Sequence, residues 1–198
     1  MTTDFNAEGI VRELRREASH LIDQGFFEEA ISRLNQCLLV EDGPDERADI
    51  LCELGFCFLR MGWYEDAVKI FSQHLQANPF DNDSRFYLAS GYASMGWIEQ
   101  STAELRKILA CDPTDVLACH ALGLCFKDQG WVKESLEIMR VAKDQAAVHG
   151  TQEEKEIIDQ SLANLEKEIE EGEEDKLKES FLLVILLAIL EGRKKKLP

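Results

Sequence analysis

Small and bulky apolar residues recur along this chain in a pattern that repeats about every 34 positions. Leu54, Leu88 and Leu122 are each followed by a small residue and, after two more positions, by an aromatic one. Apolar positions three and four residues apart indicate helices with one buried face. A fixed period of this length predicts pairs of helices that stack on their neighbours to form a solenoid.

A glycine followed directly by an aromatic residue marks the turn inside each predicted pair. These dipeptides are Gly25-Phe26, Gly62-Trp63, Gly96-Trp97 and Gly130-Trp131. Glycine tolerates the left-handed backbone that often ends a helix, so we expect the first helix of each pair to end there. The first spacing is three residues longer than the others, and we interpret the insertion Glu41–Asp45 as a longer loop because it contains the glycine, proline and aspartate of a turn.

The second unit of the pattern resembles the tetratricopeptide repeat closely. The consensus W-x2-L-G-x2-Y, A-x3-F, P is followed in order by Leu51-x2-Leu54-Gly55-x2-Phe58, Ala67-x3-Phe71 and Pro79. The other units depart from it: Arg85 replaces the first aromatic residue of the third, and Ala147 replaces the final proline of the fourth. The first unit diverges most, with Glu17 in a leucine position.

This resemblance implies an all-α fold, a right-handed α-solenoid of about four helix-turn-helix repeats closed by a C-terminal capping helix. We expect Gly55, Ala89 and Gly123 to let paired helices approach closely, and Phe71 and Met139 to fill the space between units. The expected parts are a lead-in at 1–10, a repeat domain at 11–149 (units 11–44, 48–81, 82–115 and 116–149), a capping helix at 150–172, an acidic linker at 173–180 and an apolar helix with a basic tail at 181–198.

In the tetratricopeptide family, the first helix of each pair lines a concave groove that binds a peptide or another protein. The resemblance places on this groove Arg12, Arg15, Ser19, Cys52, Phe56, Leu59, Phe86, Ser90, Ala93, His120, Leu124 and Lys127. Much of this surface is apolar, so we expect it to bury apolar side chains of a bound segment. For Phe86, packing between repeats is an equal alternative. A clamp for a chaperone's terminal carboxylate is disfavoured, because Glu53 and Asp83 stand at two of its positions.

The aromatic residues after the turn glycines occupy a position that is usually polar in this family. They are Phe26, Trp63, Trp97 and Trp131. Each ring is expected to pack against the neighbouring repeat. The alternative is a second contact surface, because tryptophan is enriched among the anchors of protein interfaces.

The residues after the repeats predict a polar cap followed by an unusual apolar segment. Thr151 and Glu154 have the spacing of a capping box, and apolar residues follow at helical spacing. Phe181 to Leu190 is ten apolar residues without a break, followed by the basic run Arg193–Lys196. As a helix it spans roughly 15 Å, half of the roughly 30 Å hydrocarbon core of a bilayer. We therefore expect burial within the protein or a homo-oligomer in preference to membrane contact.

Composition narrows the classes of partner and activity. The chain has 38 acidic and 22 basic residues and a formal net charge of −16, which disfavours binding to nucleic acid or anionic lipid. Its six cysteines lack paired CxxC spacing, so we expect reduced core thiols and no metal site. The first residues do not resemble a signal peptide, which favours a cytoplasmic location. No nucleophile, metalloprotease or phosphate-loop motif indicates an enzyme or a cofactor.

These features favour a noncatalytic adaptor or assembly scaffold that binds an apolar or amphipathic protein segment. Two alternatives stay open. The run Asp83–Ala89 followed by Met95-Gly96 resembles class II chaperones of type III secretion, which are acidic and hold apolar translocator segments. The other alternative is a self-assembling scaffold, in which Phe181 to Leu190 enters the groove of its own or a neighbouring copy.

Overall fold

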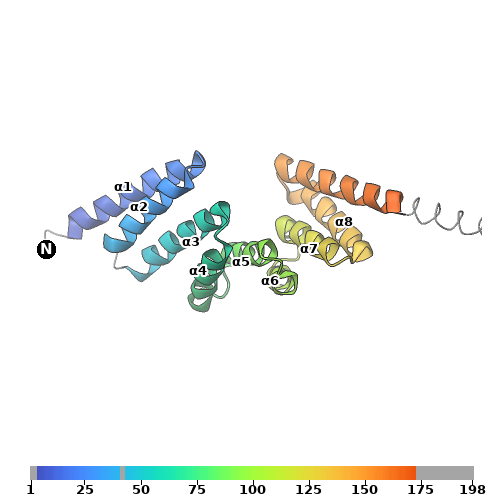
Figure 1. Cartoon of the computed structure of the whole chain (residues 1–198), viewed down its shortest axis with the longest axis horizontal. Coiled ribbons are helices and arrows are strands. Elements are labelled where there is room, and N and C mark those ends of the chain that lie inside the picture. The colour runs from blue at the N-terminus through green and yellow to red at the C-terminus, as the bar shows by residue number, and fades with distance from the viewer. Residues whose placement is uncertain (1–3, 41–42, 173–198) are drawn as a thin grey trace, which may run out of the picture.

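The computed structural model describes residues 4–40 and 43–172, and the regular structure in these ranges is entirely helical (Figure 1). The helices are α1 (Asp4–Asp23), α2 (Phe27–Val40), α3 (Pro44–Met61), α4 (Tyr64–Ala77), α5 (Asn82–Ser94), α6 (Ile98–Cys111), α7 (Val116–Asp128) and α8 (Val132–His149), and a further helix covers 152–172. Consecutive helices pair, and the pairs follow one another along a bent row. The predicted all-α solenoid is confirmed. The linker and apolar segment expected at 173–198 lie outside the described residues.

The turn between α3 and α4 shows why a glycine and an aromatic residue recur together. Gly62 has a φ of 79°, in the left-handed region. Its N–H donates to the carbonyl of Leu59 at 3.1 Å, and the N–H of Trp63 donates to the carbonyl of Phe58 at 2.8 Å. In this Schellman arrangement the last helical carbonyls are satisfied, and the residue after the glycine packs on the residue five positions earlier. The expected helix end at the turn glycine is confirmed, and the other three turns have the same conformation.

The close approach of paired helices depends on small residues at the predicted positions. A Cβ added to Gly55 would lie 2.9 Å from Cζ of Phe71, and one added to Gly123 would lie 2.6 Å from Cγ of Met139. Ala89 is 1% exposed, and Phe71 and Met139 are fully buried. Because these interiors are close-packed, a larger residue at either glycine requires the facing side chains to shift.

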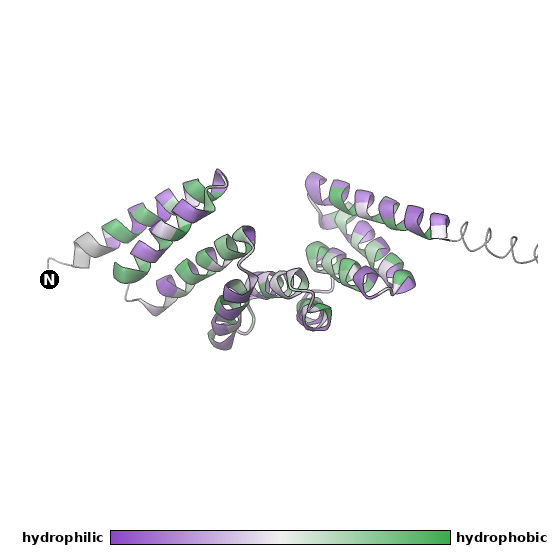
Figure 2. Cartoon of the chain, viewed as in Figure 1, coloured by the Kyte–Doolittle hydropathy of each residue, from purple (hydrophilic) through white to green (hydrophobic). Residues whose placement is uncertain are grey.

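The core is a series of clusters between successive helices. One cluster around Leu34 joins α1, α2 and α3, a second around Phe71 and Leu88 joins α3, α4 and α5, and a third around Leu105 and Leu122 joins α5, α6 and α7. In Figure 2, every helical pair carries apolar residues. Each pair therefore relies on its neighbours to cover its apolar face.

Arg85, which stands where the consensus has an aromatic residue, forms an ion pair instead. Its Nη1 donates to Oε2 of Glu104 at 2.8 Å, and the two side chains are only 13% and 14% exposed. Its Nη2 also donates to the carbonyl of Pro79. This substitution links α5 to α6 by charge and hydrogen bonds.

The helix 152–172 covers the last repeat. The N–H of Thr151 donates to Oε2 of Glu154 at 2.7 Å, and the N–H of Glu154 donates to Oγ1 of Thr151 at 3.2 Å, which confirms the capping box. Ile158 and Leu165 are each 1% exposed and pack in the clusters that include α8. Among the described residues, no helix is both long and apolar enough to cross a membrane.

Candidate binding groove

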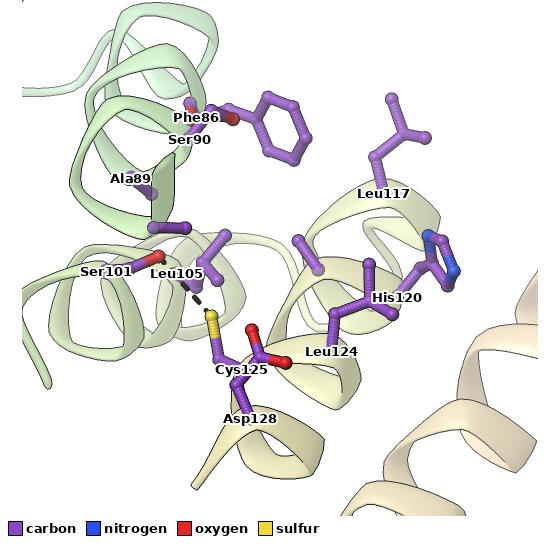
Figure 3. A pocket seen from close by; sticks show the side chains of 12 residues that line it. Phe86, Ala89, Ser90, Ser101, Leu105, Leu117, His120, Leu124, Cys125 and Asp128 are labelled. Atoms are coloured by element: carbon purple, nitrogen blue, oxygen red, sulfur yellow. Dashed lines mark hydrogen bonds between the residues drawn. The ribbon is translucent and has the colours of Figure 1, made fainter. Parts of the chain in front are cut away.

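A hollow of about 330 Å³ lies between α5, α6 and α7 (Figure 3). Phe86 contributes from α5, Leu105 from α6, and Leu117 and Leu124 from α7. The remaining lining residues are Ala89, Ser90, Ala93, Ser101, His120, Ala121, Cys125 and Asp128. Leu117 is 44% exposed and Leu124 is 40% exposed. The hollow therefore leaves apolar side chains open to water.

At the hollow, large residues of the preceding junction are replaced by small ones. Between α3 and α5, the ring of Phe56 packs edge-on against Tyr87 with centroids 5.6 Å apart, and Leu59 packs against the same core cluster as Tyr87. The residues 34 positions after Phe56, Leu59 and Tyr87 are Ser90, Ala93 and Ala121. Two rings and a leucine thus fill one junction, while a hydroxymethyl and two methyl groups leave the next one open.

Five of the predicted groove residues meet at this hollow: Phe86, Ser90, Ala93, His120 and Leu124. Phe86 packs against the core cluster of α5, α6 and α7, and its ring also borders the hollow, whereas a role in binding stays a prediction. Sequence reasoning missed Leu117, Ala121 and Asp128. Leu117 and Ala121 precede Leu124 by seven and three positions, on the same face of α7, so helical spacing alone would have found them.

The predicted groove residues of the first two repeats lie outside the hollow. Nη2 of Arg15 donates to Oε1 of Glu53 at 2.5 Å, which joins α1 to α3. Sγ of Cys52 lies 3.4 Å from Oγ of Ser84. Ser19 is exposed on α1. Most of these side chains, like Phe56 and Leu59, use their surface for contacts between repeats.

The helix 152–172 contacts His120, at the hollow, and Lys127, the remaining predicted residue. Nε2 of His120 lies 2.9 Å from Oγ of Ser161, and Nζ of Lys127 donates to Oε1 of Glu168 at 2.6 Å. Burial lowers the pKa of His120, so its ring is uncharged at neutral pH. Lys127 is paired, and the hollow presents mainly apolar surface, with an uncharged imidazole and the carboxyl group of Asp128 at its border.

Comparisons with known proteins identify the fold. No family model and no curated protein matches this chain. The solved structure of MamA from residue 41 onward, from Desulfovibrio magneticus RS-1, has a TM-score of 0.67 and 19% identity and covers 95% of this chain and 98% of its own. The tetratricopeptide protein TTC0263 from Thermus thermophilus has a TM-score of 0.66 and 17% identity, with coverage of 80% and 82%. The Sgt2 tetratricopeptide domain from Aspergillus fumigatus has a TM-score of 0.58 and 20% identity, with coverage of 67% and 83%.

This chain has the tetratricopeptide-repeat fold. Three solved structures of this fold type superpose on most of it although fewer than a quarter of the residues are identical. The repeat spacing read from the sequence and the helical pairs of the structure therefore agree with an architecture observed in other proteins.

The aromatic row of this tetratricopeptide solenoid is half open to water. The exposed fractions are 52% for Phe26, 47% for Trp63, 49% for Trp97 and 49% for Trp131. Trp97 stacks on Tyr92 with centroids 5.9 Å apart, and Trp63 and Trp131 contact the phenylalanine at the equivalent position. These ring contacts lie within one repeat, whereas the sequence led us to expect contact with the neighbouring repeat. Whether the open halves form a second contact surface stays a prediction.

Four of the six cysteine thiols of the solenoid are buried. None of the six cysteines forms a disulfide, and Cys37, Cys57, Cys119 and Cys125 are buried, whereas Cys111 is exposed. Burial raises the pKa of Cys57 to about 11, so this thiol is protonated at neutral pH. Within the described ranges, no group of three or more histidine, cysteine or acidic side chains is arranged to hold a metal ion.

Proposed function

We propose that this protein is a noncatalytic interaction module that holds an apolar or amphipathic segment of another protein in the hollow between α5 and α7. The observation that carries the proposal is the open apolar surface of Leu117 and Leu124 on α7, across from Phe86 on α5. Apolar surface left open in a concave site is typical of a binding groove.

The hollow suits a small number of apolar anchors. Its volume of about 330 Å³ is near the lower end of the roughly 300–1,000 Å³ found for ligand pockets. Burial of two leucine-sized anchors contributes about 3–6 kcal/mol, part of which offsets the cost of immobilising the segment. Micromolar affinity corresponds to about 8 kcal/mol. We therefore expect a bound segment to contact the groove beyond the hollow as well.

Capture of a partner by matched surface variants tests the proposal. Leu124→Glu places a charge at the hollow, and Val141→Glu places the same charge on α8 at a residue with a similar exposed fraction, 42% against 40%. Tagged full-length proteins are incubated with a lysate of the source cells, and bound proteins are quantified by mass spectrometry. We expect Leu124→Glu to lower the specific capture about tenfold, which corresponds to about 1.4 kcal/mol, and Val141→Glu to leave it unchanged.

Circular dichroism confirms that both variants are folded before capture is compared. Equal capture by the native chain and by Leu124→Glu would place the binding surface elsewhere and refute the proposal. Equal loss with both glutamate variants would refute it too, since the effect would then follow from charge and not from position.

A dedicated chaperone for an apolar secreted or membrane-bound protein is the second candidate. The combination of a net charge of −16 with an open apolar hollow supports it, because an acidic surface keeps a complex with an apolar client soluble. Co-expression separates the two functions. A chaperone's client aggregates when it is expressed alone, whereas the partner of an adaptor stays soluble.

A further inference from the structure

We propose that the hollow is occupied by the chain's own apolar segment, Phe181 to Leu190. This inference rests on the proposed function, because it names an occupant for the same hollow. The segment consists of ten consecutive apolar residues and lies outside the described part of the chain. A stretch of this kind needs cover from water. Leu117 and Leu124 offer open apolar surface that needs the same cover.

The described chain ends close enough for the segment to reach the hollow. The helix 152–172 runs parallel to α7, because Ser161 meets His120 and Glu168 meets Lys127. Residue 172 therefore lies about 6 Å beyond the level of Lys127, at about 1.5 Å per residue. Packed helices lie about 10 Å apart. The linker 173–180 reaches up to roughly 26 Å when extended, which is enough to cross α7.

The position of the linker sets the direction of the segment. A chain that arrives from residue 172 enters at the C-terminal end of α7, near Asp128, and runs back towards Leu117, antiparallel to α7. From Leu117 to Asp128 the helix covers about 16 Å, and ten helical residues cover about 15 Å. Phe181 then lies nearest to Asp128, and Leu190 lies nearest to Leu117.

Charge favours the same direction. The basic run Arg193–Lys196 follows the apolar segment and would emerge at the N-terminal ends of α5 and α7. Asp81, Asp83 and Asp115 stand at these ends, and Asp112 caps the C-terminal end of α6, four residues before α7 begins. Asp83 and Asp112 are exposed, and neither forms an ion pair with another described residue. The four cations would therefore meet exposed carboxylates, which helps to fix the register of the segment.

When the chain's own apolar segment occupies the hollow, a partner protein has to compete with that segment for the same site. A tethered segment has an effective concentration in the millimolar range, so a partner must displace it. Removal of residues 181–198 is expected to raise partner capture about tenfold when the segment binds its own hollow with a dissociation constant of about 0.1 mM.

Photo-crosslinking in the full-length chain tests the site and its direction. The photoreactive residue p-benzoylphenylalanine is placed at position 182 in one variant and at position 189 in another. Crosslinked peptides are mapped by mass spectrometry, and denaturing gels show whether one chain or two are joined. We expect position 182 to react within 124–128 and position 189 to react near Leu117, in both cases within a single chain.

Two variants test whether the crosslinks depend on the hollow. Leu124→Glu should lower these crosslinks about tenfold, and Val141→Glu should leave them unchanged. Crosslinks between two chains would overturn occupation by the chain's own segment in favour of a second copy. Crosslinks outside the hollow, the reverse order of the two positions, or the absence of any crosslink would overturn the proposal as well.

The chain without residues 181–198 separates this inference from the proposed function. When partner capture by the shortened chain remains sensitive to Leu124→Glu, the hollow binds partners whether or not its own segment enters it. When that sensitivity is lost while the native chain gives the expected crosslinks, the hollow serves the chain's own segment alone.

Discussion

Filling the hollow with the residues of the preceding junction is expected to abolish binding and to preserve the fold. The double substitution Ser90→Phe and Ala121→Tyr reproduces, 34 positions later, the pair formed by Phe56 and Tyr87. Positions 90 and 121 are the repeat equivalents of Phe56 and Tyr87, so we expect the two rings to meet in the space between α5 and α7. A filled hollow offers no room for anchors from a partner.

The size of the stability change follows from the contacts of this site. Two half-buried rings remove roughly 150 Å² of apolar surface from water, which contributes about 4 kcal/mol, and their edge-on contact adds about 1 kcal/mol. Ordering two side chains costs about 2 kcal/mol, and loss of the hydrogen bond that Oγ of Ser90 donates to the carbonyl of Phe86 at 2.9 Å costs about 1 kcal/mol. The double variant should therefore be about 2 kcal/mol more stable than the native chain.

Urea unfolding followed by circular dichroism measures this change, and the capture assay measures binding. Val148→Phe serves as the control, because it adds a ring on α8 at a residue that is 74% exposed and fills no hollow. A double variant less stable than the native chain by more than about 1 kcal/mol would show that the space differs in shape from the preceding junction. Undiminished partner capture by a folded double variant would show that the hollow is not the binding site.

Three further outcomes are expected. Trp97→Ala should destabilise the chain by about 2 kcal/mol in urea unfolding, because about half of the ring is buried against Tyr92 and its neighbours; undiminished partner capture by the folded fraction would argue against a second contact surface. Gly123→Ala should cost about 1–3 kcal/mol, seen as a lower thermal midpoint, because the new Cβ would lie 2.6 Å from Cγ of Met139; an unchanged midpoint would contradict this packing. Burial lowers the pKa of His120 below its ordinary 6.5, so as pH falls the unfolded chain takes up a proton at this residue before the folded chain does. The free energy of unfolding should therefore decrease below about pH 6.5. His120→Gln should flatten this part of the pH profile of stability.

The part of the candidate site that follows the repeat pattern was predictable from the sequence. The repeat register placed Phe86, Ser90, His120 and Leu124 on one surface, and the structure brings all four to the hollow. The register did not separate open positions from filled ones. Phe56 was assigned to the same surface as Leu124, yet its ring packs against Tyr87 from the next repeat.

The sequence by itself determined the helices, their pairing and the turn chemistry. These features depend on contacts between residues close in the chain, such as the carbonyl of Phe58 with the N–H of Trp63, and on a pattern repeated often enough to be read without coordinates. The capping box at Thr151 and Glu154 is local in the same sense.

Only the tertiary structure decided where the solenoid is open. The hollow depends on side chains that lie far apart in the sequence, since Ser90 on α5 and Ala121 on α7 line the same space only in the folded chain. Cover by the helix 152–172 likewise joins Lys127 to Glu168 across 41 residues. The repeated sequence determines how each unit folds. The space left between two units depends on the side chains of both units together, so one unit alone does not determine it.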